Sequence, residues 1–151
     1  MLRTHIIIFA VIVLCVGVAF NGEGMDGKEG EQSMKTLRPC PSSPNCIASQ
    51  SGDPQHSMDP IPFTGPREMA QARLRKVLQA MPRSEITKEE PGYIAVSFRS
   101  RMFGFVDESE FVFDEKSGLV HFRSGARTGY YDFGVNRSRM RQIAETFKAD
   151  E

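Results

Sequence analysis

The sequence has no surplus of either charge. Lysine and arginine together number 19, as do aspartate and glutamate, and the isoelectric point is near 6.8. Proteins that bind nucleic acid through a general electrostatic field carry a clear excess of basic residues. The balance therefore argues against a nucleic-acid partner, and any electrostatic recognition has to be local.

The sequence also lacks the short motifs of common catalytic sites. It has no Gly-x-Ser-x-Gly elbow, no His-Glu-x-x-His and no Cys-x-x-Cys. Its 151 residues leave room for one domain once a targeting segment is removed. These absences favour a binding module over an enzyme, and no cofactor is indicated.

An apolar run of membrane-spanning length is missing too. The longest covers residues 6–20 and follows a short basic start, whereas a transmembrane helix needs about 20 residues. We predict that residues 1–24 are a secretory signal peptide. The alternatives are an uncleaved anchor that associates with the membrane through the same run, or a lipid-modified N-terminus at Cys15. Each of them predicts an extracytoplasmic domain, either periplasmic or secreted.

Cysteine is scarce outside that segment. Cys40 and Cys46 lie in PCPSSPNC, a proline-punctuated stretch. In an oxidising compartment such a pair is most simply a disulfide, which stabilises a small loop by about 2 kcal/mol. A redox-active pair, or a metal site completed by His56, is the weaker alternative because the spacing is wide and a fourth ligand is missing. We predict a structural disulfide and no metal site.

Composition divides the rest of the chain into a linker and a folded part. Residues 25–38 are rich in glycine and charge and are predicted to be a flexible linker. Residues 39–151 are predicted to form the domain. Its first part, residues 39–62, has no regular periodicity and is predicted to be an ordered loop.

Apolar periodicity predicts two helices separated by strands. The first helix is predicted over residues 66–81, opened by proline and stopped by Pro82. The second is predicted to begin at Asn136 as N-cap, with a hydrophobic staple between Val135 and Met140. Alternation and turn residues predict strands at 86–89, 93–99, 105–113 and 119–124.

This order predicts an α+β fold, a two-layer sandwich. We expect an antiparallel sheet of three to five strands with the two main helices packed on one face. Alternation places six residues in the core, namely Val96, Phe98, Phe111, Phe113, Val120 and Phe122. It places Arg99, Glu110, His121 and Arg123 on the other face, which is either a solvated surface with cross-strand ion pairs or the wall of a ligand groove.

Residues 123–140, RSGARTGYYDFGVNRSRM, are dense in arginine. Arg137 and Arg139 fall in the first turn of the predicted helix, where a cation opposes the helix dipole. A negative partner is therefore expected nearby. If it is internal, with Asp132 or Asp107 as examples, the arginines clasp the helix to the sheet. If it is external, they form a pocket for an anion.

The candidate binding residues follow from this segment. They are Arg123, Arg127, Tyr130, Asp132, Asn136, Arg137 and Arg139. Tyr130 is interpreted as an aromatic at the core edge, with a stacking platform as the alternative. Asp132 is interpreted as an acceptor for backbone N–H groups in a turn, with a general base as the alternative.

Three motifs resemble the uncharacterised DUF1499 family. They are PCPSSPNCIAS, FGFVDESEF and FRSGARTGYYDFGVNRSRM, in that order, over about residues 37–148. The resemblance implies an exported or membrane-associated domain. It supplies no established activity.

The sequence therefore favours a non-enzymatic module that binds an anionic small molecule, a lipid headgroup or an acidic protein segment through its arginines. One alternative is a hydrolase or transferase in which His121 exchanges protons with Asp132 or Glu110. The other is an interaction scaffold that uses an exposed apolar patch around Met69 and Met81 on the first helix.

Overall fold

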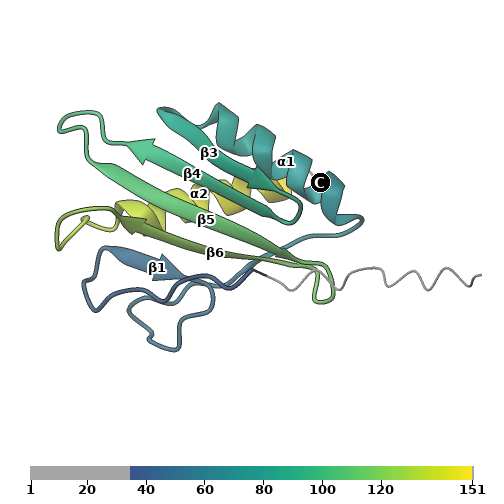
Figure 1. Cartoon of the computed structure of the whole chain (residues 1–151), viewed down its shortest axis with the longest axis horizontal. Coiled ribbons are helices and arrows are strands. Elements are labelled where there is room, and N and C mark those ends of the chain that lie inside the picture. Colours follow the sequence, from purple (N-terminus) through teal and green to yellow (C-terminus); the bar gives the residue numbers. More distant parts are fainter. Residues whose placement is uncertain (1–34, 151) are drawn as a thin grey trace, which may run out of the picture. The chain divides into compact units, whose positions relative to one another are not determined.

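The described part of the chain forms an antiparallel sheet and two helices (Figure 1). The computed structural model describes residues 35–150, which belong to one compact unit. The helices are α1 (Arg67–Ala80) and α2 (Val135–Ala149). The predicted α+β class is confirmed.

The sheet has six strands, more than the three to five predicted. They are β1 (Cys46–Ala48), β2 (Ile61–Pro62), β3 (Ser84–Glu90), β4 (Tyr93–Arg99), β5 (Val106–Asp114) and β6 (Leu119–Ala126). The order is β1-β6-β5-β4-β3, and β2 also pairs with β6. The two unpredicted strands, β1 and β2, come from the proline-rich stretch. They are only three and two residues long, too short to leave a periodic pattern.

Helix α1 begins one residue later than predicted. Pro66 is the N-cap, with extended backbone, and Met81 is the C-cap. A proline fits there because the N–H it lacks would have no partner inside the helix. The buried residues recur at helical spacing and are Ala70, Leu74, Val77 and Leu78.

Alternation along β4, β5 and β6 divides the sheet into two faces. The core face carries the six predicted core residues, all at most 5% exposed, namely Val96, Phe98, Phe111, Phe113, Val120 and Phe122. They share one apolar cluster with residues of both helices, including Leu74, Met140, Ile143 and Phe147. Burying each such side chain stabilises the fold by about 1.5–3 kcal/mol. The predicted core is confirmed.

The opposite side is called the open face below. It carries Tyr93, Ala95, Ser97, Glu108, Glu110, Val112, His121 and Arg123. Residues 35–40, called the strap, run beside part of it. Leu37 of the strap packs with Tyr93 and Val112, and the Lys35 ammonium lies 3.5 Å from the centroid of the Tyr93 ring. The strap includes the last residues of the predicted linker.

The strap ends at the predicted disulfide. Cys40 and Cys46 are bonded, with Cα atoms 5.6 Å apart. Cys46 pairs with Gly125 of β6, where a Cβ atom would lie 3.2 Å from the Cys46 sulfur. A side chain here would push the disulfide away by a few tenths of an ångström, so glycine suits this close approach. The disulfide holds the strap and β1 against the edge of β6.

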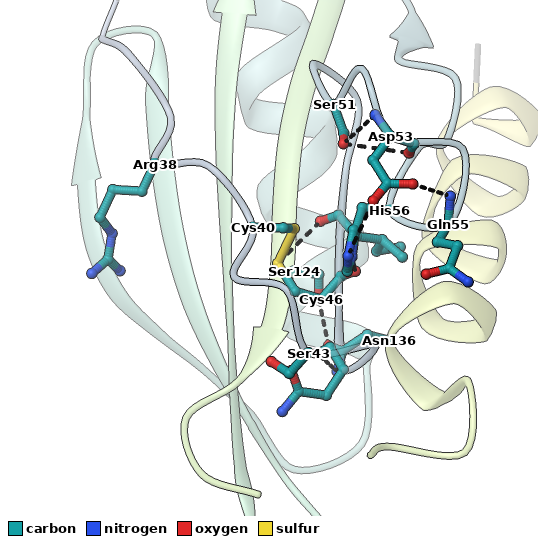
Figure 2. Close-up of a disulfide and its surroundings, with 12 residues drawn as sticks. Arg38, Cys40, Ser43, Cys46, Ser51, Asp53, Gln55, His56, Ser124 and Asn136 are labelled. Carbon is teal, nitrogen blue, oxygen red and sulfur yellow. Dashed lines mark hydrogen bonds and ion pairs between the residues drawn. A yellow bond between two sulfur atoms is a disulfide. The ribbon is translucent and has the colours of Figure 1, made fainter. Parts of the chain in front are cut away.

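The alternative metal site at these cysteines is not formed, because the disulfide leaves no thiolate. The Nδ1–H of His56 donates to the carbonyl of Cys46 at 2.8 Å (Figure 2). No group of three or more potential metal ligands is found within residues 35–150.

The signal peptide, the anchor and the lipidation of Cys15 are predictions for residues outside those described. Within the described part of the chain, neither helix is long and apolar enough to cross a membrane.

Candidate functional site

Helix α2 is capped by a different residue from the one predicted. Gly134 occupies the N-cap position with φ 74°, and Asn136 lies inside the first turn. The carboxylate of Asp132 accepts hydrogen bonds from the N–H groups of Gly134 and Asn136, both at 3.0 Å. The left-handed glycine allows the chain to turn so that Asp132 reaches these donors.

The predicted Asn136 cap is therefore wrong, and so is the staple. Val135 is itself the first helical residue and is 47% exposed. The interpretation of Asp132 as an acceptor in a turn is confirmed by its hydrogen bonds.

Asn136 is instead the centre of a buried polar network. Its Nδ2 donates to Asp132 at 2.9 Å, and its Oδ1 accepts from Ser124 Oγ at 2.6 Å and from Arg139 Nη1 at 3.0 Å. The Ser124 hydroxyl also lies 2.7 Å from that of Ser109. All of these polar side chains have partners, as buried polar groups require.

Arg139 extends this network to the sheet. Its Nη2 donates to Asp107 Oδ2 at 2.7 Å, and both side chains are at most 12% exposed. The guanidinium carbon lies 4.4 Å from the centroid of the Phe98 ring. Removing one partner of such a pair leaves an uncompensated buried charge. Arg139 therefore acts as a clasp between α2 and β5.

Arg137 is also held by the chain itself. It donates to the carbonyls of Ser57 at 2.8 Å and Gln55 at 2.7 Å. The partners of the two cations at the start of α2 thus include one carboxylate and two carbonyl groups. Internal partners are what the clasp alternative expected. Neither guanidinium is directed at a free anion.

The remaining two arginines of the segment lie on the side of the open face. Arg127 forms an exposed ion pair with Glu108, 2.7 Å between Nη2 and Oε1. Arg123 is half-buried, and no hydrogen bond to its guanidinium is found among the described residues; its Nε is buried. Burial lowers the pKa of Arg123, and the nearby charge of Arg38 adds to the effect, while the charges of Glu110 and Glu108 oppose it. The four arginines therefore do not form one cluster.

The two carboxylates near Arg123 contact other side chains, and one oxygen of Glu110, Oε2, is buried without a hydrogen-bond partner among the described residues. Glu110 pairs in register with Arg123, but it accepts a hydrogen bond from the Tyr93 hydroxyl at 2.7 Å. Arg38 of the strap, which points away from the disulfide in Figure 2, lies 3.7 Å from the second oxygen of Glu110. Burial and the bond to Glu110 raise the pKa of Tyr93.

A hollow of about 180 Å³ opens beside these groups. Its walls include polar residues of the strap and of three strands, namely Arg38, Thr87, Tyr93, Ser97, Glu108 and Glu110. Arg123 is not one of the lining residues, but its register partner Glu110 is.

His121 is not placed as the hydrolase alternative requires. Its Nδ1 lies 3.3 Å from Ser49 Oγ, which also accepts from the N–H of Phe122. No hydrogen bond from His121 to a carboxylate is found in residues 35–150. The two expected partners are engaged, Asp132 by α2 and Glu110 by Tyr93.

The predicted aromatic and apolar contacts also differ from expectation. Tyr130 is 72% exposed, so its interpretation as a core-edge residue is wrong. On α1, Met69 is exposed but Met81 packs against the core. The two methionines therefore form no common patch for a scaffold.

The buried network joins the three motifs of the sequence. Asn45, from the first motif, accepts at its carbonyl from the N–H of Ala126 at 3.0 Å and donates to the carbonyl of Gly129 at 2.6 Å. Asp107 and Ser109 come from the second motif, and Ser124 from the third. A model of the family described as "Protein of unknown function (DUF1499)" matches residues 36–147. The chain belongs to the DUF1499 family. No curated protein matches the sequence.

Sequence reasoning missed part of the network in this DUF1499 domain. The alternation that buries Phe111 also places Ser109 and Asp107 on the core face, so the pattern contained this information. The same alternation along β6 places Ser124 on the core face, together with Phe122. For Asn45 the sequence offered no periodicity, because the residue lies in the proline-rich loop of the DUF1499 domain.

Proposed function

We propose that this DUF1499 domain is a two-layer sandwich whose open face binds a carboxylate or phosphate group, as a non-enzymatic module outside the cytoplasm. Arg123 is the observation that carries the proposal. Its half-buried guanidinium has no hydrogen-bond acceptor among the described residues. The disulfide is compatible with an oxidising compartment.

The charges around Arg123 support an external anion. Glu108 is paired with Arg127, and Glu110 is engaged by Tyr93 and Arg38. The guanidinium groups of Arg38, Arg123 and Arg127 carry three positive charges, and the two carboxylates carry two negative charges. One positive charge is therefore not balanced. A bound oxyanion would supply the missing acceptor, because a guanidinium fork matches two oxygens of a carboxylate or phosphate.

The adjacent hollow limits the size of the ligand. A volume of about 180 Å³ admits one small polar group rather than an extended chain. A free small anion, a lipid headgroup and an acidic side chain share this chemistry. We therefore propose the class of anion and let the experiment separate the sources.

Titration calorimetry on the full chain tests the proposal. The ligands are inorganic phosphate, malonate, glycerol phosphate and a short Glu-rich peptide. We expect Arg123→Gln to weaken binding at least about tenfold, because a charge-assisted hydrogen bond is lost. Arg123→Lys keeps the charge without the fork and should be intermediate.

Arg141→Gln is the matched control. Arg141 is exposed on α2 and should leave binding unchanged. If Arg123→Gln binds every ligand as the wild type does, or if no ligand binds the wild type, the proposal is wrong.

A further inference from the structure

Two loops at one end of the sheet carry most of the exposed large apolar side chains. The loops, residues 100–105 before β5 and 127–134 after β6, leave the same end of adjacent strands (Figure 1). The N–H of Arg127 donates to the carbonyl of Val106 at 2.9 Å, which joins their bases. We call these two loops the loop end.

Exposed large apolar side chains gather at the loop end. Eight large apolar side chains are exposed within residues 35–150, and Met69 on α1 is the one that lies elsewhere. The other seven lie in or next to the loops and are Met102, Phe103, Phe105, Tyr130, Tyr131, Phe133 and Val135. A soluble surface rarely gathers so many, and such a patch is typical of an interaction site.

Phe133 adds evidence from backbone strain. It has φ 55° and is 86% exposed, and its ring lies 5.0 Å from that of Tyr131. The left-handed region is costly for a bulky residue, and glycine or asparagine would adopt it more easily. No core contact offsets this cost, which points to a role for the aromatic ring outside the fold.

The loop end is cationic although the whole chain is neutral. Together with the last residue of β4, it contains Arg99, Arg101 and Arg127 and a single acid, Asp132. The carboxylate of Asp132 is engaged at the start of α2, and Arg127 pairs with Glu108 of β5. Arg99 and Arg101 therefore leave a positive charge beside the apolar tips.

We infer that the loop end inserts into the interface of a lipid bilayer that contains anionic lipids. Phenylalanine, tyrosine and methionine would enter the boundary between headgroups and acyl chains, and the arginines would contact anionic headgroups. The shape favours a bilayer over a protein, because fluid lipid fills the space between two separate loop tips. A rigid protein would need a surface matched to both.

This inference does not depend on the anion site, since that site rests on Arg123, whereas the loop end rests on the apolar tips with Arg99 and Arg101. Soluble phosphate and malonate probe the open face, whereas bilayer insertion is read at the loop tips. Either proposal can fail while the other holds.

The absence of tryptophan from the chain allows a local test. Phe103→Trp places one fluorophore at the loop end, and Met69→Trp places one at an exposed position on α1 as the matched control. The full-length variants are mixed with vesicles of phosphatidylcholine, with and without phosphatidylglycerol. Emission wavelength and quenching by brominated acyl chains report insertion at each site, whatever else in the chain contacts the vesicle.

We expect a blue shift and strong quenching for the Phe103→Trp variant on the anionic vesicles, and little change for the Met69→Trp variant. Adding Arg101→Glu to the Phe103→Trp chain should raise the lipid concentration at half-maximal quenching about tenfold, because a charge that attracts anionic lipid becomes repulsive. Adding Phe133→Ser should raise it by a similar factor through lost apolar burial.

Three results would overturn the inference. One is an unchanged emission spectrum of the Phe103→Trp variant with both kinds of vesicle. Another is equal quenching of the two variants, which would show contact without an oriented loop end. The third is a spectral shift of the Phe103→Trp variant that needs no lipid and grows with protein concentration, which would assign the surface to self-association.

Discussion

Arg139 and Arg123 belong to the same short segment and meet opposite surroundings. Arg139 lies on the core side, bonded to Asp107 and Asn136 and stacked near Phe98. Arg123 lies on the open face with no acceptor among the described residues. The comparison teaches that the density of arginine in a sequence does not define a site. The partners that the fold supplies separate a structural cation from one available for binding.

The polar groups around the two arginines follow the same division. On the core side, Ser109 and Ser124 of the sheet and Asn136 of α2 are buried and hydrogen-bonded to one another or to neighbours. A network whose members all have partners stabilises one arrangement of the fold. On the open face, the hollow and the unsatisfied guanidinium leave room for a ligand.

Replacing Arg139 should give the largest effect. Arg139→Met keeps the contact with Phe98 but leaves Asp107 as an unpaired, nearly buried carboxylate. We expect the free energy of unfolding in urea to fall by about 3 kcal/mol. Arg141→Met, an exposed change on the same helix, should cost less than about 0.5 kcal/mol.

The comparison would fail if Arg139→Met and Arg141→Met lowered the free energy of unfolding by the same small amount. Adding Asp107→Asn to Arg139→Met should recover part of the loss, because the stranded charge is removed. A double-mutant cycle measures that coupling.

Tyr93→Phe tests the one closely paired hydroxyl of the open face. Losing the bond to Glu110 should lower the free energy of unfolding by about 1 kcal/mol at neutral pH. Burial and Glu110 raise the pKa of Tyr93 in the folded chain. Above the ordinary tyrosine pKa of about 10, the unfolded chain releases the proton first and so binds fewer protons, and wild-type stability falls as pH rises.

The stability difference between the wild type and Tyr93→Phe should therefore be full below a pH of about 10 and shrink above it. Urea unfolding at a series of alkaline pH values measures this. If the stability difference stays constant through that range, the pKa of Tyr93 is not raised in the folded chain.

Arg123→Leu should have the smallest effect on stability. The substitution removes a half-buried charge that forms no hydrogen bond among the described residues, so we expect a change within about 0.5 kcal/mol, in either direction. Urea unfolding beside Arg139→Met makes the contrast direct. A loss as large as that of Arg139→Met would make Arg123 a second clasp and remove its availability for an anion.

Much of the fold was predictable because long elements leave periodic patterns. Strand β4 was predicted with its observed bounds, and β5, β6 and α1 with small shifts at their ends. Their buried residues repeat at period 2 or 3.6, which the sequence displays directly.

The rest depended on contacts between distant parts of the chain. Strands β1 and β2 exist because β6 offers them an edge, and two or three residues carry no pattern of their own. The cap of α2 depended on the left-handed backbone of Gly134, which redirects Asp132. Arg123 and Arg139 meet different partners because one lies on strand β6 and the other on helix α2.

The pairing of β1 with β6 has a consequence for how the chain assembles. Cys46 of the first strand is aligned with Gly125 of the last long strand, so this contact closes a loop that contains most of the domain. Closing such a loop is slow compared with forming the hairpins of β3 to β6. We therefore expect the hairpins to gain protection from amide exchange first. The first strand to be synthesised would then be the last to join the sheet.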